Sequence, residues 1–272
     1  MAICNLGHIA RTATLRAQGW TRASIAGALA RGELVRLRRG TYACAHLDHP
    51  LAVAARSAGA LTCVSVLREL GVWSGHDRRI HVQLATSSSR AAVGAVSHWS
   101  NARFGHSTPW RATTMEALWQ AMHCLDEENA IAAMESAVAE GALTEAQVRR
   151  LGVLAPRRLQ HGIRDLEFTS GSGNETFVRR RLRGVGFSVV AQGEVPGLGH
   201  QDLVVDELVG LEIDSREWHG EKQAAKDRDR DRISESLGRR VLRISPSHVH
   251  ATWPHTLSTI ERMVADARRA RR

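Results

Sequence analysis

The chain has 272 residues and a formal net charge of +9, and its length favours two folded domains, or two joined by a connecting segment. The sequence has no uncharged apolar run long enough to span a bilayer, and its start lacks the features of a signal peptide. These absences predict a soluble cytoplasmic protein with no membrane partner. The positive charge is carried chiefly by arginine, which favours an anionic partner, nucleic acid first.

The cysteines are Cys4, Cys44, Cys63 and Cys124, which are widely separated and form no C-x-x-C pair. This spacing argues against a zinc knuckle and against a thioredoxin-like motif. We therefore expect ordinary reduced thiols.

Residues 1–48 have the element order of a winged helix-turn-helix. A short helix is predicted over residues 9–18, and Thr21 then stands where the cap of a second helix belongs, with Ile25 and Leu29 on one face. The segment ELVRLRRGTYAC alternates apolar and basic residues and has Arg39-Gly40 at a turn, which predicts a basic hairpin, or wing.

Such a domain could present one helix end and one hairpin to DNA. The first residues of the second helix can enter a major groove, while arginines of the wing lie along the phosphates. The candidate DNA-binding residues are Thr21, Arg22 and Ser24 on the helix and Arg36, Arg38 and Arg39 on the wing. The plainer alternative is a small helical cap whose arginines are only solvated.

The phrase RGELVRLRRGTYA resembles the N-terminal winged-helix domain of AbiEi-type antitoxins from type IV toxin–antitoxin systems. The resemblance implies DNA binding and autoregulation, and it continues more weakly to about residue 150. Self-association and a toxin partner are therefore open possibilities.

Residues 49–160 are expected to form a mostly helical middle segment without chemistry of its own. Helices are predicted over 51–70, 114–124 and 127–140, and a strand over 79–85. The aromatic and imidazole side chains of this segment are expected to be structural; they are Trp99, Trp110, Trp119, His98 and His123. A stretch rich in Arg, Pro, Gly and Ser at 155–173 predicts a domain boundary.

Residues 165–272 are expected to form the catalytic domain. NETFVRRRLRGVG predicts a helix with Asn174 as its cap and Gly186 as its end, and its apolar residues are Val178, Leu182 and Val185. The segments FSVVAQGEV, QDLVV and LVGLEID predict strands. The last two are joined by an acidic turn at Asp206-Glu207, so they should pair antiparallel.

Acidic residues gather at one end of this predicted hairpin. Glu212 and Asp214 are two residues apart and therefore point to one face, and Asp202 opens the adjoining strand. Carboxylates so close repel one another unless a cation lies between them, and oxygen ligands of this kind suit Mg²⁺. His219 follows on the loop, where it could move protons, and Glu175 could be a further ligand or orient a water.

The segments NETFVRRRLRGVGF, VPGLGHQDLVV, LEIDSREWHG and KDRDRDRISESLGRRVLRIS, in this order, resemble the very-short-patch-repair (Vsr) endonuclease-like branch of the PD-(D/E)XK nucleases. The resemblance covers nearly the whole domain and implies a restriction-endonuclease-like fold, a mixed sheet flanked by helices, and metal-dependent DNA cleavage. By position, Asp202 matches the first aspartate of the motif, Glu212 and Asp214 its second acidic cluster, and His219 the histidine that follows Trp218.

The sequence departs from that pattern at three points. Gln201 stands where the superfamily often has proline, Ser215 stands where glycine is common, and no lysine follows Glu212 by two positions. A missing lysine is typical of the histidine-using branch, so it does not by itself imply an inactive site.

Together these features predict an α/β (α+β) protein that is a Mg²⁺-dependent DNA endonuclease hydrolysing phosphodiester bonds. The expected catalytic residues are Glu175, Asp202, Glu212, Asp214 and His219, with Asp202 and Glu212 as the metal ligands. The alternative is a DNA-binding transcriptional regulator, similar to a type IV antitoxin, whose nuclease domain is degenerate and not catalytic. No sequence feature specifically favours action on RNA.

Overall fold

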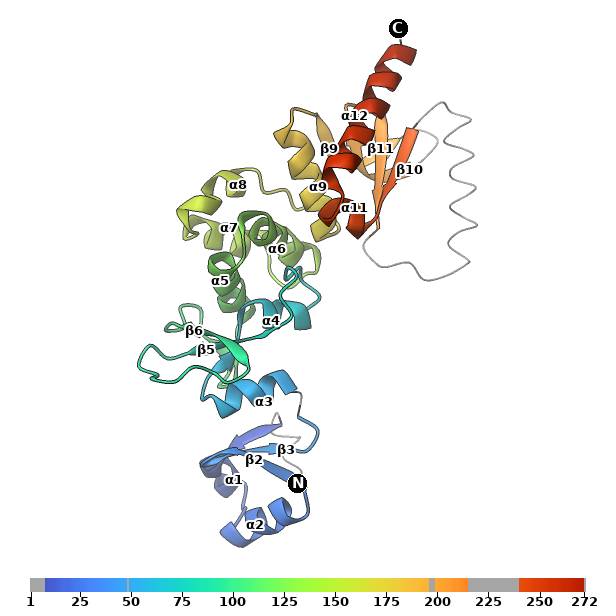
Figure 1. Cartoon of the computed structure of the whole chain (residues 1–272). Coiled ribbons are helices and arrows are strands. Elements are labelled where there is room, and N and C mark those ends of the chain that lie inside the picture. Colours follow the sequence, from blue (N-terminus) through green and yellow to red (C-terminus); the bar gives the residue numbers. More distant parts are fainter. Residues whose placement is uncertain (1–7, 48, 196–198, 215–239, 272) are drawn as a thin grey trace. The chain divides into compact units, whose positions relative to one another are not determined.

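A computed structural model describes residues 8–47, 49–195, 199–214 and 240–271, and it has both helices and sheets, as the predicted α/β class requires (Figure 1). Contacts divide the chain into two compact units. Unit 1 consists of Met1–Leu125 with Val153–Pro156, and unit 2 of Asp126–Gly152 with Arg157–Arg272. Among the described helices, none is both long and apolar enough to cross a bilayer.

The first part of unit 1 is a small three-stranded sheet with two helices. In chain order its elements are β1 (Ile9–Arg11), α1 (Thr12–Ala17), α2 (Arg22–Ala30), β2 (Leu34–Arg38) and β3 (Thr41–Cys44). The strands lie in the order β1-β3-β2, and both pairings are antiparallel. The prediction of a helix from residue 9 was wrong for residues 9–11, because these residues pair with β3 and the helix begins only at Thr12.

Helix α2 and the hairpin after it follow the prediction. The Thr21 hydroxyl accepts a hydrogen bond from the backbone N–H of Ser24 at 3.1 Å, and the Ser24 hydroxyl accepts one from the N–H of Thr21 at 2.9 Å. This reciprocal pair satisfies two N–H groups that a helix start leaves without partners. Gly40, with φ of +75°, occupies the turn between β2 and β3.

The second part of unit 1 is a five-stranded sheet with three helices. Its strands lie in the order β6-β5-β4-β8-β7, and β5 and β6 are parallel. The elements are α3 (His49–Arg56), β4 (Ala60–Leu61), α4 (Cys63–Glu69), β5 (Ile80–Leu84), β6 (Ala95–Trp99), β7 (His106–Thr108), β8 (Arg111–Ala112) and α5 (Thr114–Cys124). Strand β5 and helix α5 confirm two of the predicted elements.

The prediction of one helix over residues 51–70 was wrong, because β4 interrupts it. Ala60 and Leu61 pair with Gln83 and Val82 of β5. A β-carbon on Gly59 would collide with the carbonyl oxygen of Gln83, so the chain reaches the sheet at a residue without a side chain. Strand pairing with residues more than twenty positions away therefore outweighs the helical preference of this alanine-rich segment.

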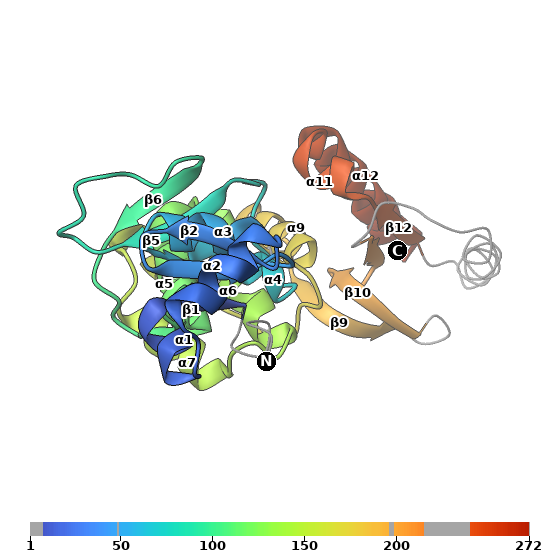
Figure 2. The same ribbon diagram turned by 90° about the horizontal axis from the view of Figure 1, so that it is seen from below.

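Unit 2 contains a four-stranded mixed sheet. Its strands lie in the order β12-β11-β10-β9, with β11 and β12 parallel and the other pairs antiparallel. Figure 2 shows β9 and β10 side by side. The strands are β9 (Val189–Val195), β10 (Gly199–Val205), β11 (Val209–Ile213) and β12 (Arg240–Ile244).

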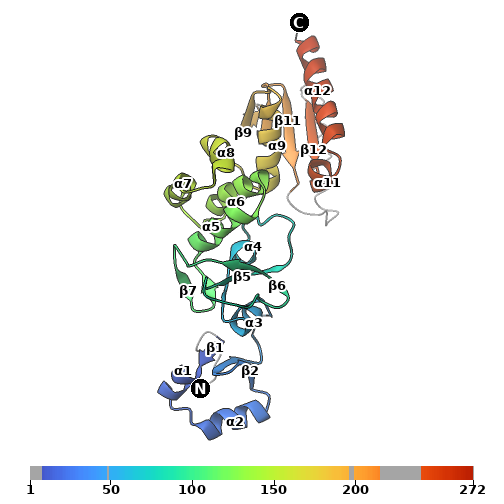
Figure 3. The same cartoon turned by 60° about the vertical axis from the view of Figure 1, so that its left-hand side comes forward.

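Helices precede and follow this sheet (Figure 3). They are α6 (Glu127–Ala139), α7 (Glu145–Val153), η2 (Arg157–Leu159), α8 (Gln160–Arg164), α9 (Gly173–Gly184), α11 (Pro246–His250) and α12 (Trp253–Ala270). Helix α9 packs against β9 and β10, and α12 packs against β11 and β12. The side chains of Leu203, Leu211 and Ile244 are buried between these layers.

A buried ion pair joins α6 to α9. Both oxygens of Glu135 lie 2.6 Å from a guanidinium nitrogen of Arg179, and neither side chain is exposed to solvent. Glu135 also accepts hydrogen bonds from the hydroxyl of Thr176 at 2.6 Å and from the N–H of Glu167 at 2.9 Å. The division in contacts falls at 125/126, at 152/153 and at 156/157, so α6 belongs to unit 2 although it precedes the predicted boundary near residue 160.

The start of α9 differs from the prediction by two residues. Ser172, not Asn174, is the cap, because its hydroxyl accepts a hydrogen bond from the N–H of Glu175 at 3.3 Å. Asn174 is buried inside the helix, and its side-chain oxygen lies 2.8 Å from the Nε2 atom of His250. Val178 and Leu182 are buried as expected, whereas Val185 is 54% exposed because it follows the last helical turn. Phe177, which was not among the predicted apolar residues of this helix, is also buried.

Candidate functional site

The β10–β11 hairpin brings two of the predicted acidic residues to opposite positions. Leu203 pairs with Leu211, so the same antiparallel register places Asp202 opposite Glu212. Side chains alternate between the two faces of a strand. Leu203 and Leu211 are fully buried, whereas Asp202 and Glu212 are half-buried. The acidic residues therefore occupy the face that turns away from the apolar core.

Each of these two carboxylates has a contact that fixes it. One oxygen of Asp202 accepts the backbone N–H of Ile213 at 2.6 Å, which ties it to the neighbouring strand. The Oε2 atom of Glu212 accepts a hydrogen bond from Nε of Arg243 at 3.1 Å, across the parallel pair of β11 and β12. Because Glu212 and Arg243 are paired positions, their side chains leave the sheet on the same face.

Asp214 lies directly after β11, and its position is set by the sheet. Its backbone N–H donates to the carbonyl of Ile244 at 3.0 Å, which extends the parallel pairing by one hydrogen bond. Asp214 is half-buried, and alternation along the strand places it on the face of Glu212. His219 and Trp218 lie outside the described residues, so the role expected for His219 stays a prediction.

Glu175 is the most deeply buried of the candidate acids, with only 5% of its surface exposed. It lies in the first turn of α9, and its Oε2 atom accepts the N–H of Gly171 at 2.7 Å and the side-chain amide of Gln192 at 3.2 Å. Burial raises the pKa of Glu175, and the negative charge of Asp202 raises it further, while the hydrogen bond from Gly171 opposes the shift. Glu175 is thus electrostatically coupled to Asp202.

This raised pKa predicts that Glu175→Gln stabilises the chain at neutral pH. The folded state binds a proton at Glu175 more readily than the unfolded state does. The stability that this group contributes is therefore present below the ordinary glutamate pKa and is lost as the pH rises through the folded pKa. Glutamine keeps an oxygen acceptor for Gly171 and Gln192 but carries no charge. Urea denaturation in EDTA should show a higher midpoint for the variant at neutral pH, and the gain should vanish in acid.

The matched control for this comparison is Glu261→Gln, at an exposed position of α12. It should change the midpoint little at either pH. A Glu175→Gln variant that is less stable than wild type at neutral pH would show that the carboxylate is the favoured form, contrary to the pKa direction.

The donor set of the acidic face fits a hard cation held by few protein ligands. Among the described residues, the acids do not gather as three ligand atoms within 4.8 Å of one another. Mg²⁺ does not need such a cage, because it usually takes one or two carboxylates and completes its shell with waters and a phosphate. Asp202 and Glu212, which face each other across the hairpin, are the two residues that could hold it.

The candidate DNA-binding residues of unit 1 are divided by their exposure. Arg22, Arg36 and Arg39 are exposed, but Arg38 is half-buried, with its guanidinium 5.9 Å from the centre of the Trp110 ring. The Thr21 and Ser24 side chains are exposed and form the cap of α2.

Two of the tryptophans expected to be structural differ in exposure. Trp110 is buried, whereas Trp99 is 49% exposed and its ring N–H donates to the carbonyl of Ser88.

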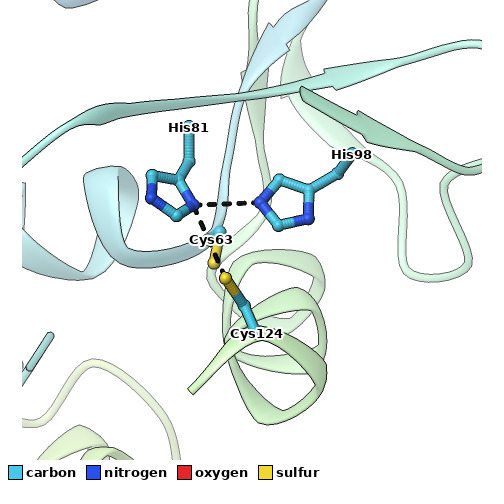
Figure 4. Close-up of side chains that lie close together, drawn as sticks. All are labelled: Cys63, His81, His98 and Cys124. Atoms are coloured by element: carbon cyan, nitrogen blue, oxygen red, sulfur yellow. Dashed lines mark hydrogen bonds between the residues drawn. The ribbon is translucent and has the colours of Figure 1, made fainter. Parts of the chain in front are cut away.

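Sequence reasoning missed a second cluster, which lies in unit 1 and consists of Cys63, His81, His98 and Cys124 (Figure 4). Burial raises the pKa of the Cys63 thiol well above its ordinary value. Contact with the Cys63 thiol, and then with the imidazoles of His81 and His98, lowers the pKa of Cys124. The sequence predicted ordinary reduced thiols and an ordinary histidine at position 98, whereas the structure brings His98 and the two cysteines together with His81.

Comparison of the chain with protein-family models and with curated proteins finds no match. A functional assignment therefore depends on the geometry and chemistry of the side chains themselves.

Proposed function

We propose that the chain is a Mg²⁺-dependent endonuclease that hydrolyses DNA phosphodiester bonds. The observation that carries this proposal is the placement of Asp202 opposite Glu212 on the half-buried face of the β10–β11 hairpin, with Glu175 electrostatically coupled to Asp202. A mixed sheet with helices packed on it is consistent with the restriction-endonuclease-like fold that the sequence resemblance implies. We expect the protein to act in the cytoplasm.

In this proposal each acid has a separate task. Asp202 and Glu212 would hold the Mg²⁺ ion, which would supply positive charge that polarises the scissile phosphate and lowers the pKa of the attacking water. The N–H of Ile213 orients the Asp202 carboxylate toward the site. Glu175, whose raised pKa makes it a better proton acceptor than an exposed glutamate, takes up the proton of the attacking water. Asp214 adds negative charge beside Glu212 and strengthens the attraction for the cation.

DNA is the proposed substrate because of the net charge of +9 and the exposed arginines of unit 1. A helix with an exposed cap, followed by an arginine-tipped hairpin, is the arrangement expected of a winged helix-turn-helix that binds phosphates with its wing. In this proposal unit 1 supplies binding and unit 2 supplies the chemistry.

One observation favours the alternative, a DNA-binding regulator with an inactive nuclease-like unit. The Arg243 guanidinium forms an ion pair with Glu212, one of the two residues assigned to the metal. An ion pair at this position compensates the charge of the carboxylate and competes with a cation for it. The endonuclease remains the main proposal because a carboxylate has two oxygens and can accept from a guanidinium and bind a cation together.

The experiment that separates the two functions measures DNA binding and DNA cleavage in the same preparation. The purified chain is incubated with supercoiled plasmid and Mg²⁺, with Ca²⁺, or with EDTA, beside the Asp202→Ala variant. An endonuclease should cut only with Mg²⁺ and should lose cleavage, but not binding, on substitution of Asp202. Binding without any cleavage by the wild type would favour the regulator.

The wing predicts a specific change in the salt dependence of DNA binding. Arg36 and Arg39 are the exposed arginines of the hairpin, so each is expected to release counterions from one phosphate. Substituting both with alanine should reduce the slope of log K against log salt by about 2, since each contact contributes about 0.9. Binding titrations at several salt concentrations measure this slope.

The control is a double variant with the same loss of charge elsewhere, Arg150→Ala with Arg262→Ala, at exposed positions of α7 and α12. Its slope should stay close to that of the wild type. Equal slopes for the wing variant and the wild type would remove the wing from the DNA interface.

A further inference from the structure

Four metal-ligand side chains from four separate segments meet in unit 1 (Figure 4). Cys63 is the first residue of α4, His81 lies in β5, His98 lies in β6, and Cys124 is the last residue of α5. One ligand atom from each side chain lies within 4.8 Å of all the others. The four side chains point toward one another, so the convergence is three-dimensional and does not follow from a local sequence motif.

The spacing between these atoms is close to that of a tetrahedral zinc site. The Nδ1 atom of His81 lies 2.9 Å from Nε2 of His98 and 3.9 Å from the sulfur of Cys124. Zinc binds sulfur at about 2.3 Å and imidazole nitrogen at about 2.0–2.1 Å, which in a tetrahedron separates neighbouring ligand atoms by about 3.3–3.8 Å. Small side-chain movements would therefore admit the ion.

The backbone holds the ligands in this arrangement. His98 pairs with Gln83 in the parallel β5–β6 ladder, so His98 and His81 lie on one face of the sheet, diagonally across two strands. The N–H of Thr62 donates to the carbonyl of His81 at 3.0 Å, which fixes the residue before Cys63 to the same strand. Cys63 itself has φ of +53°, a left-handed conformation that is unfavourable for a residue with a side chain.

Asp77 orients one of the imidazoles. A carboxylate oxygen of Asp77 lies 3.3 Å from Nε2 of His81, and the same carboxylate is held by Arg79. A carboxylate partner keeps the proton of His81 on Nε2, so that Nδ1 presents its lone pair to the cluster. Histidines that bind metals in proteins commonly have such a partner, which fixes both the tautomer and the orientation of the ring.

We propose that Cys63, His81, His98 and Cys124 bind one structural Zn²⁺ ion. Two thiolates and two imidazoles are the donor set that zinc prefers, and a tetrahedral arrangement of sulfur and nitrogen ligands distinguishes it from Mg²⁺ and Ca²⁺, which prefer oxygen. With four protein ligands the ion has no open position, so its role is to join α4 and α5 to the β5–β6 pair. Cys63 and His81 are fully buried and Cys124 is exposed, so one side of the site is accessible to the ion from solvent.

This site is independent of the proposed nuclease function, and its test uses metal content and stability. The full chain is purified under reducing conditions and its zinc is measured by elemental analysis, together with Cys124→Ser, His98→Ala and His123→Ala variants. His123 lies beside Cys124 but outside the cluster, and its Nδ1 contacts the carbonyl of Trp119. The wild type and His123→Ala should carry one zinc per chain, and the two cluster variants should fall to background.

Two further measurements keep the test decisive if a variant folds poorly. Removing metal from the wild type with a chelator should lower its melting temperature, and Zn²⁺, but not Mg²⁺, should restore it. Co²⁺ added to the metal-free wild type should give the visible bands of a tetrahedral ion and a thiolate charge-transfer band.

Two results would overturn the proposal. One is a wild type that neither retains zinc nor responds to added Zn²⁺ or Co²⁺. The other is a Cys63–Cys124 disulfide that forms under the same reducing conditions, because the sulfurs would then be unable to bind the ion.

Discussion

Glu135→Ala should destabilise unit 2 by about 3–5 kcal/mol, the usual cost of removing one partner from a buried ion pair. The substitution leaves the Arg179 guanidinium fully buried, and among the described residues the partly exposed Glu167 is then its remaining acidic partner. It also removes the nearer of the two acceptors of the Thr176 hydroxyl and the acceptor of the N–H of Glu167. The cost therefore combines an uncompensated charge with unsatisfied hydrogen-bond donors. Urea denaturation followed by circular dichroism measures it as a lower midpoint.

The control is Glu145→Ala, which breaks the exposed pair of Glu145 and Arg149 on α7. Both of those side chains are more than half exposed, so the loss should be below about 1 kcal/mol. A double variant, Glu135→Leu with Arg179→Met, should recover part of the loss because no charge remains buried. Equal midpoints for Glu135→Ala and Glu145→Ala would mean that the buried pair does not stabilise the unit.

Asp202→Ala and Glu212→Ala should each reduce DNA cleavage by more than about 100-fold. Partners that only support a metal ligand typically cost about 10–100-fold when they are removed, so loss of a direct ligand should cost more. The rate of plasmid cleavage under saturating DNA is the measurement, repeated over a range of Mg²⁺ concentrations. Binding of DNA should change little, because the proposal assigns binding mainly to unit 1.

Glu261→Ala is the matched control, since it removes an exposed carboxylate from the same unit. It should cut DNA at the rate of the wild type. Cleavage at equal rates by the wild type, Asp202→Ala and Glu212→Ala would indicate a contaminating nuclease and would refute the proposed site. Full activity in Glu212→Ala alone would show that Glu212 is not needed to hold the metal ion.

Local patterns predicted the elements that depend on neighbouring residues. The cap at Thr21 needs only Ser24, three residues away, and the β10–β11 hairpin needs only alternating side chains and a tight turn. The opposition of Asp202 and Glu212 then follows from strand geometry. The alternation of side chains in the hairpin therefore predicts much of the acidic face, but it does not predict the ion pair between Glu212 and Arg243.

Features set by distant contacts were not predictable in the same way. Ser172 and Asn174 are both good caps, and Asn174 is taken into the helix where its side chain meets His250, far along the chain. The Cys–His cluster draws on positions from 63 to 124 with no repeated spacing. The two cysteines and two histidines form no local sequence motif that would predict a metal site. The pairing of β5 with β6 and the packing of α4 on α5 bring them together.

The link between α6 and α9 also determines where the chain can be divided. A fragment that begins after residue 160 would keep Arg179 but lose Glu135, and it would carry a guanidinium into an apolar interior without its main counterion. A fragment that begins at Asp126 retains both partners. A fusion that transfers the C-terminal unit to another protein would therefore have to include α6, even though a Gly- and Ser-rich stretch separates α6 from the sheet in sequence.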